Sequence, residues 1–156
     1  MKTLIKSLIV ASVLLLSFNS YAEVIIRPHL AAGQFATDDI SGTSTNIGAR
    51  LLLSVGGVQS YGIAVNRFKL TSDDLTEDEE FNSFGIYLEQ VIAGWFNMGI
   101  GTVGYFGLYE QNPVGLSTSL GWQDKNGRFL IAFRNDVIAT EKNLTNINSI
   151  MAGIKF

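Results

Sequence analysis

The sequence predicts an all-β protein of eight antiparallel strands that close into an up-and-down barrel. Apolar side chains alternate with small or polar ones along eight stretches of the chain, which is the period of a β-strand. Polar or glycine-rich breaks separate these stretches. Beyond the N-terminal segment, no stretch of useful length has the period of a helix. These observations favour one β domain without a linker or a second unit.

The first 22 residues are expected to be a cleaved signal peptide. Lys2 and Lys6 precede an apolar segment at 8–18, and Ser20 and Ala22 supply small residues at the cleavage-site positions. The apolar segment is too short to be an uncleaved anchor, since about 20 residues are needed to span a bilayer. We therefore expect one barrel domain over residues 23–156.

Charge and cysteine content narrow the classes of function. The formal net charge is −3 for the whole chain, and it falls to about −5 once the two signal-peptide lysines are removed. This balance argues against nucleic acid as a partner. The chain has no cysteine, so disulfides and thiolate metal sites are excluded. An exported domain without disulfides could be held together by a closed ring of strand hydrogen bonds.

The closing stretch shows the strand pattern clearly. One phase carries Phe156, Ile154, Ala152 and Ile150, and the other carries Lys155, Gly153, Met151 and Ser149. The eight expected strands lie at about 24–35, 45–55, 61–70, 81–92, 96–108, 114–123, 129–136 and 146–156. Strands of roughly ten residues match the length that crosses a bilayer at a tilt of about 45°.

Three observations favour an apolar face turned toward lipid. The opposite face carries mostly Gly, Ser, Ala and Asn, unlike a water-facing sheet. The strand glycines fall on that face, apart from Gly104, as expected of a narrow barrel interior. Aromatic residues gather at the strand ends, as interfacial anchoring requires. The expected periplasmic girdle is Tyr61, Trp95, Phe96, Trp122, Phe129 and Phe156. A second band is expected from Phe35, Phe81, Phe84 and Phe106, with Phe68 on the opposite phase.

Together these features resemble the small outer-membrane barrels of the outer-membrane protein X, opacity-protein and outer-membrane protein A (transmembrane half) type. The resemblance covers nearly the whole chain and implies an eight-stranded transmembrane β-barrel in the cell outer membrane of a Gram-negative bacterium. It also implies that Ile154 and Phe156 form a C-terminal assembly signal, read by the barrel insertion machinery. No family-defining loop motif is present. The alternative fold is a soluble periplasmic barrel of lipocalin type that binds a small ligand.

Charged residues on the inward phase form an expected interior polar network. Its members are Arg27, His29, Arg50, Glu89, Arg134 and Asp136, with Lys155 on the same phase and Tyr87, Tyr105 and Tyr109 as hydrogen-bonding partners. Buried charges should pair, because an isolated one costs several kcal/mol. Position along the strands suggests that Arg50, Glu89 and Arg134 meet. The network is expected to fill the barrel, and the alternative is a gate for ions.

The remaining polar residues indicate no catalytic, cofactor or metal site. His29 is the single histidine, and an inward histidine fits a polar network better than a catalytic base. The acidic run from Asp73 to Glu80 lacks the ligand spacing of a calcium loop, so a solvated loop is favoured.

We therefore expect a non-enzymatic protein with a structural or surface-interaction role in the cell envelope. Its expected partners are outer-membrane lipid and lipopolysaccharide, and the oligomeric state is left open. The alternatives are a narrow gated ion channel, an enzyme that modifies lipid A, and the soluble ligand binder.

Overall fold

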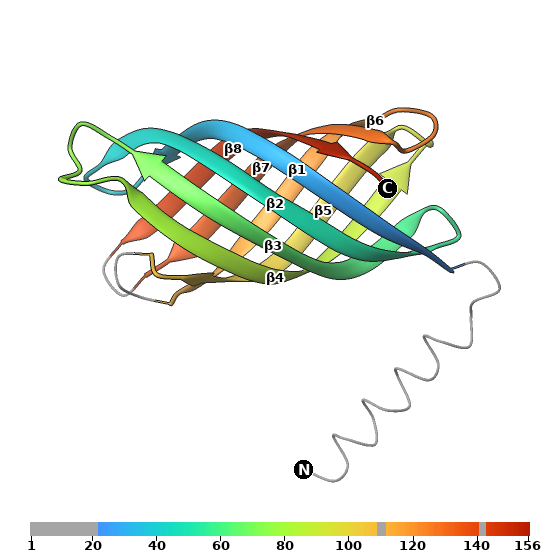
Figure 1. Ribbon diagram of the computed structural model, residues 1–156, viewed down its shortest axis with the longest axis horizontal. Helices are drawn as coiled ribbons and strands as arrows, with labels where there is room; N and C mark the ends of the chain where they lie inside the picture. The colour runs from blue at the N-terminus through green and yellow to red at the C-terminus, as the bar shows by residue number, and fades with distance from the viewer. Residues whose placement is uncertain (1–21, 109–111, 141–142) are drawn as a thin grey trace, which may run out of the picture.

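The computed structural model describes residues 22–108, 112–140 and 143–156. The expected signal peptide and Tyr109 therefore lie outside the described residues, apart from Ala22. Eight strands form a closed barrel in which each pairs antiparallel with its sequence neighbours and β8 pairs with β1 (Figure 1). The predicted fold class is confirmed. The strands are β1 (Ala22–Ala36), β2 (Ser41–Val55), β3 (Gln59–Thr71), β4 (Glu79–Ile92), β5 (Phe96–Phe106), β6 (Val114–Gln123), β7 (Phe129–Ala139) and β8 (Leu144–Ile154).

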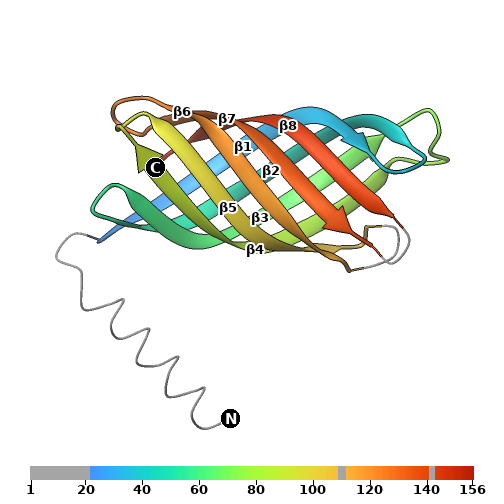
Figure 2. The same cartoon turned by 180° about the vertical axis from the view of Figure 1, so that it is seen from behind.

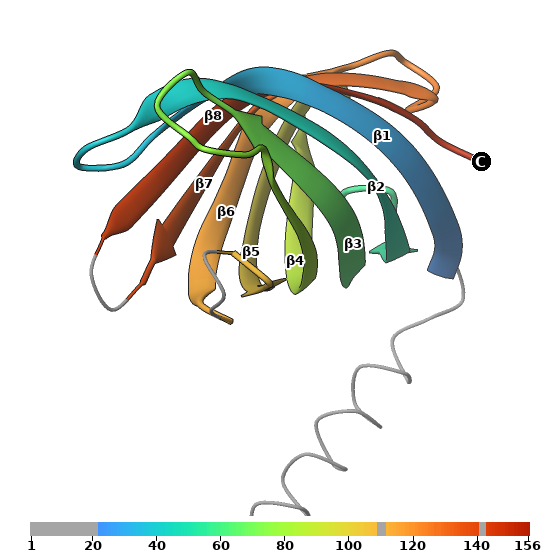
Figure 3. The same cartoon turned by 60° about the vertical axis from the view of Figure 1, so that its left-hand side comes forward.

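The two ends of the barrel differ. One end, called here the turn end, holds the start of β1, the end of β8 and the short connections 56–58, 93–95 and 124–128. The other, the loop end, holds the connections 37–40 and 72–78 and the described residues 107–108, 112–113, 140 and 143, and Figure 3 brings it forward. Gly56 and Gly57 have φ angles of 62° and 69°, a left-handed conformation that glycine adopts without strain. The described residues contain no helix long and apolar enough to cross a membrane.

The strands run obliquely round the barrel, with β1–β4 on one wall and β5–β8 on the other (Figures 1 and 2). A path that follows paired residues once round the ring starts at Glu23 on β1. It returns to β1 at Gly33, ten residues further along. Such a stagger requires tilted strands, since closure links strand number, shear and tilt.

Closure brings neighbouring backbones close together at inward-facing glycines. A Cβ on Gly33 would lie 1.9 Å from the carbonyl oxygen of Asn148, and one on Gly62 would lie 1.9 Å from that of Leu51. No side chain fits at such a separation. Gly33 therefore allows β1 to approach β8 where the ring closes.

The seam between β1 and β8 has one defect in its hydrogen bonding. Ile26 and Phe156 exchange backbone hydrogen bonds, at 3.3 and 2.9 Å, and His29 lies opposite Gly153. Pro28 lies between these two points and has no N–H to donate. The ladder therefore lacks one donor close to the turn end of the seam.

The faces of the strands follow the alternation, with two corrections. Phe84 and Phe106 lie on the outer face, but Phe35 and Phe81, expected in an outer aromatic band, are 2% exposed inside the barrel. Their phase is the reason, since Phe81 is an odd number of residues from Phe84. Leu108, at the end of the expected strand 96–108, shares the outward phase of Phe106 and would therefore lie outside if that strand continued. The strand ends at Phe106, Gly107 turns with a φ angle of 92°, and Leu108 is buried.

Candidate functional site

The interior contains a buried carboxylate that two guanidinium groups share. Glu89 of β4 accepts hydrogen bonds from Arg27 of β1 through Oε2 and from Arg50 of β2 through Oε1. All three side chains are at most 4% exposed. Removing charges from water is costly, and pairing with charge-assisted hydrogen bonds offsets much of that cost. This triad links three strands across the barrel.

Arg50 makes two further contacts. Its Nη2 lies 3.6 Å from the sulfur of Met151 on β8. Its guanidinium carbon lies 4.6 Å from the ring centroid of Tyr87, a cation–π arrangement. The charge is thus surrounded by polarisable groups as well as by its partner.

A second ionic cluster lies nearer the loop end. Arg134 and Asp136 of β7 form an ion pair at 2.8 Å between Nε and Oδ2, and Nη2 of Arg134 donates to Oδ1 at 2.9 Å. The hydroxyl of Tyr105 also donates to Oδ1 of Asp136, at 2.8 Å. All three side chains are fully buried. Two donors therefore satisfy one oxygen of this carboxylate.

His29 belongs to a chain of polar side chains that leads to this cluster. Its Nε2 lies 2.8 Å from Oδ1 of Asn66, which also accepts from Arg134 at 3.1 Å, while Nδ2 of Asn66 donates to Ser83 at 2.9 Å. Because an amide oxygen only accepts, Nε2 of His29 carries the proton. The histidine is 3% exposed, and its ring belongs to the interior network.

Apolar side chains close the interior above the ionic clusters. Phe68 and Phe81 stack with ring centroids 4.9 Å apart, and Tyr105 lies about 6 Å from both rings. Ile40 and Leu75, from two loops, pack against them. We call this group the loop-end cap, and its other fully or almost fully buried members are Phe35, Leu70, Leu108, Ile138 and Ile147.

The turn end is hollow by comparison. A cavity of about 280 Å³ is lined mainly by polar groups, among them Arg27, Glu89, Ser60 and Gln123. Asn97 also lines it and is fully buried. The sequence analysis did not single out Asn97, although its inward phase on β5 could have indicated it.

The expected meeting of three charges is found only in part. Arg50 and Glu89 lie together, but Arg134 pairs with Asp136, and Arg27 takes the place expected of Arg134. Counting residues along each strand ignores the stagger. A row of paired residues lies closer to the loop end on each successive strand. Lys155 lies at the rim, where it pairs with Glu23 at 2.9 Å.

The aromatic residues expected in a girdle lie on the outside near the turn end. Trp122, Phe129 and Phe156 are 49%, 54% and 75% exposed. Trp95, in the turn between β4 and β5, packs edge-on against Phe96 at 5.8 Å, and Tyr61 is half-buried on the same outer face. Ile154 is also outward and 46% exposed.

The acidic run is divided between a loop and the start of β4. Asp78 pairs with Lys69 and Glu80 pairs with Arg67, each at 2.6 Å on the surface. The hydrogen bond from Lys69, with a second from Thr71, lowers the pKa of Asp78 below its ordinary value. Within the described ranges, no group of three or more His, Asp or Glu side chains could hold a metal ion.

Comparison with known proteins supports the fold alone. The sequence matches no protein-family model and no curated protein. The outer membrane enzyme PagL has a TM-score of 0.59 at 14% identity, covering 82% of this chain and 98% of its own. Neisserial surface protein A has a TM-score of 0.53 at 12% identity, with 86% and 99% covered. The attachment invasion locus protein Ail of Yersinia pestis, in complex with sucrose octasulfate, has a TM-score of 0.47 at 13% identity, with 86% and 98% covered.

The chain therefore has the fold of the small eight-stranded outer-membrane β-barrels, and the predicted resemblance is confirmed.

Proposed function

We propose that this protein is a non-enzymatic integral protein of the outer membrane, with a structural or surface-interaction role in the cell envelope. One observation carries the proposal: large apolar side chains cover the outside of the barrel. Leu30, Ile86 and Val114 are each more than 60% exposed. A soluble protein rarely exposes contiguous apolar patches beyond a few hundred Å², whereas lipid requires such a face. The turn end would face the periplasm and the loop end the outside.

The same observation argues against the soluble lipocalin-like alternative. A soluble barrel turns its apolar face inward around a ligand, but here the inward face carries two ionic clusters and a hydrogen-bonded histidine. The fold is shared with PagL, an outer membrane enzyme, and with Neisserial surface protein A. This similarity supports the membrane placement.

Cell fractionation and gel mobility test the placement. We expect the protein in isolated outer membranes, and we expect the unheated sample to migrate differently from the boiled one, because a closed barrel resists SDS until heated. Recovery from the periplasm as a soluble protein without a heat shift would contradict the proposal.

A structural role rather than a channel is supported by the loop-end cap. Its packed side chains lie between the ionic clusters and the loop end. We expect the purified protein to show no conductance steps in planar bilayers. Steps in the wild type that change with Glu89→Ala would support the gated channel instead.

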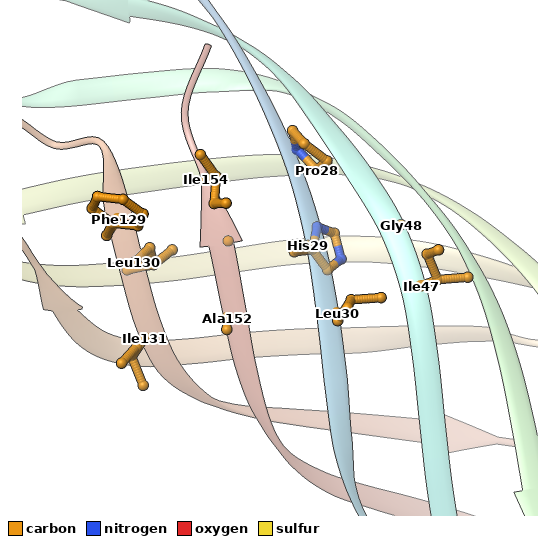
Figure 4. A pocket seen from close by; sticks show the side chains of 11 residues that line it. Pro28, His29, Leu30, Ile47, Gly48, Phe129, Leu130, Ile131, Ala152 and Ile154 are labelled. Atoms are coloured by element: carbon orange, nitrogen blue, oxygen red, sulfur yellow. The ribbon is translucent and has the colours of Figure 1, made fainter.

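An enzymatic role is the alternative, because the outer membrane enzyme PagL has the same fold. Acyl-chain chemistry on a membrane lipid would require a base that the lipid can reach. His29 borders a groove on the outer seam (Figure 4), but it is only 3% exposed and its Nε2 is bound to Asn66 inside the barrel. We expect unchanged lipid A mass spectra on deletion and on overexpression. A mass change that His29→Asn abolishes would overturn this view.

We further propose that Phe156 and Ile154 act as the assembly signal. The backbone of Phe156 exchanges hydrogen bonds with that of Ile26 and so extends the pairing of β8 with β1. Deleting Phe156 should lower the amount of heat-modifiable protein in the membrane, whereas Phe156→Tyr should leave most of it, because the aromatic side chain remains.

A further inference from the structure

The buried charges of the barrel interior do not balance. Among the described residues, the buried side chains that are charged at neutral pH are those of Arg27, Arg50, Arg134, Glu89 and Asp136. Three guanidinium groups therefore face two carboxylates. Arg134 and Asp136 pair with one another, so the excess positive charge belongs to the triad of Arg27, Arg50 and Glu89. A buried charge without a counter-charge is costly, and this one lacks a second carboxylate.

The polar cavity at the turn end lies beside this excess charge. Arg27 and Glu89 both line it, and Arg50 donates to the other oxygen of the same carboxylate. The cavity measures about 280 Å³, whereas one water molecule needs only about 10 to 15 Å³. It therefore has room for a small anion together with part of its hydration shell.

The other charged groups around the cavity also favour an anion. Glu23 and Lys155 line it but pair with one another at 2.9 Å, so their charges offset each other. Lys125, from the turn between β6 and β7, lines it as well and has no ion-pair partner within the described part of the chain. Cations therefore outnumber carboxylates in the lining, and the resulting potential attracts anions from the turn end.

Asn97 supplies a buried donor without a partner. Its side chain is fully buried and lines the cavity, yet the described residues offer no hydrogen-bond partner to either its Nδ2 or its Oδ1. Nε of Arg27 is unpartnered among them in the same way. Buried polar atoms are almost always hydrogen-bonded, and N–H groups beside a positive charge form their strongest hydrogen bonds with an anion. The unused donors thus indicate a ligand that accepts hydrogen bonds.

We propose that the turn-end cavity binds one small inorganic anion, held by Arg27 and by the side-chain amide of Asn97, as the counter-ion of the triad of Arg27, Arg50 and Glu89. The proposal goes beyond the structural role given above, because it assigns a ligand site inside the barrel. It does not depend on the membrane placement, since inward-facing side chains form the site.

Isothermal titration calorimetry of the folded mature barrel tests the site. The protein is held in an uncharged detergent at low ionic strength, and sodium chloride and sodium sulfate are titrated separately, so that a halide and a tetrahedral oxyanion are compared. We expect a saturable heat that fits one site for at least one of the two salts. If neither salt gives a saturable heat, water alone fills the cavity and the proposal is wrong.

Two charge variants should change the affinity in opposite directions. Arg27→Gln removes the excess positive charge, so we expect at least about tenfold weaker binding, the effect of losing a hydrogen bond to a charged group. Glu89→Gln removes the carboxylate that competes with the anion, so we expect tighter binding. A substitution that only loosened the barrel would weaken binding in both variants, and that result would contradict the proposal.

Asn97→Leu tests the uncharged donor at nearly constant side-chain size. We expect about fivefold weaker binding, the effect of losing one net hydrogen bond. The matched control for charge is Arg67→Gln, because Arg67 is exposed and paired with Glu80, and it should bind the anion as wild type does. Heat-modifiable mobility shows that each variant still forms a closed barrel. Unchanged binding in both Arg27→Gln and Asn97→Leu, or an equal loss in Arg67→Gln, would overturn the proposed site.

Discussion

The two halves of the barrel interior are filled by different kinds of side chain. Toward the turn end, Glu89 pairs with two arginines beside a polar cavity of about 280 Å³. Toward the loop end, aromatic and aliphatic side chains of the loop-end cap pack tightly above the Arg134–Asp136 ion pair. Charges in the first half are fixed by partners, whereas side chains in the second are fixed by shape. The two halves should therefore respond differently to single substitutions.

The largest expected effect is that of Glu89→Ala in the turn-end half. This change leaves Arg27 and Arg50 buried without their shared carboxylate, and breaking a buried ionic pair costs about 3 to 5 kcal/mol. Equilibrium urea unfolding of the barrel in vesicles measures the loss. Glu80→Ala, which breaks the exposed pair with Arg67, should cost much less. Equal losses would mean that water reaches the interior freely.

A slightly smaller loss is expected for Phe81→Ala in the loop-end cap. The ring is 2% exposed and stacked on Phe68, so its removal leaves a cavity and should lower the unfolding free energy by about 3 to 4 kcal/mol. Phe84→Ala is the matched control, because Phe84 lies three residues away on the outer face. If Phe84→Ala costs as much, the cap is not the tightly packed half.

The contrast between inside and outside predicts a further loss for Ile86→Arg. Ile86 is 67% exposed on the outer face of β4, and a charge near the bilayer midplane costs about 2 to 4 kcal/mol, against about 0 to 1 near an interface. Asn82→Arg, four residues nearer the loop end on the same face, should be almost neutral. Similar values for the two arginines in the vesicle assay would show that the face does not meet hydrocarbon.

The smallest effect concerns the exposed pair of Asp78 and Lys69. The hydrogen bond from Lys69 lowers the pKa of the Asp78 carboxyl, so the stability from this pair is present above the unfolded value near 3.8 and is lost as pH falls through the lower folded value. An NMR titration should place the Asp78 midpoint below 3.8, and Lys69→Ala should raise it. An unchanged midpoint in Lys69→Ala would show that the pair does not form in solution.

Strand number, strand order and most faces can be predicted from alternation, because a period of two assigns each residue to a face once one member is placed. The inward positions of Arg27, His29 and Glu89 follow in this way. Which charges meet cannot be predicted so simply, since the answer depends on the stagger of ten residues round the ring. Arg134 was therefore matched with the wrong partner.

Other features depend on geometry that no local pattern contains. Leu108 enters the cap because the chain turns at Gly107, and the groove on the outer seam exists only because β7, β8 and β1 lie side by side. Asn135, Asn146 and Asn148 interrupt the apolar phase of two strands. Only the pairing of β7 with β8 shows that their three side-chain amides bond to one another.

The pairing of β1 with β8 also has a consequence for biosynthesis. The two strands that meet at the seam are the first and the last of the eight, so β1 keeps an open edge until β8 has been made. Until then the β8-facing edge of β1 has no partner strand. The missing donor at Pro28 leaves one site fewer on that edge for premature pairing with another chain.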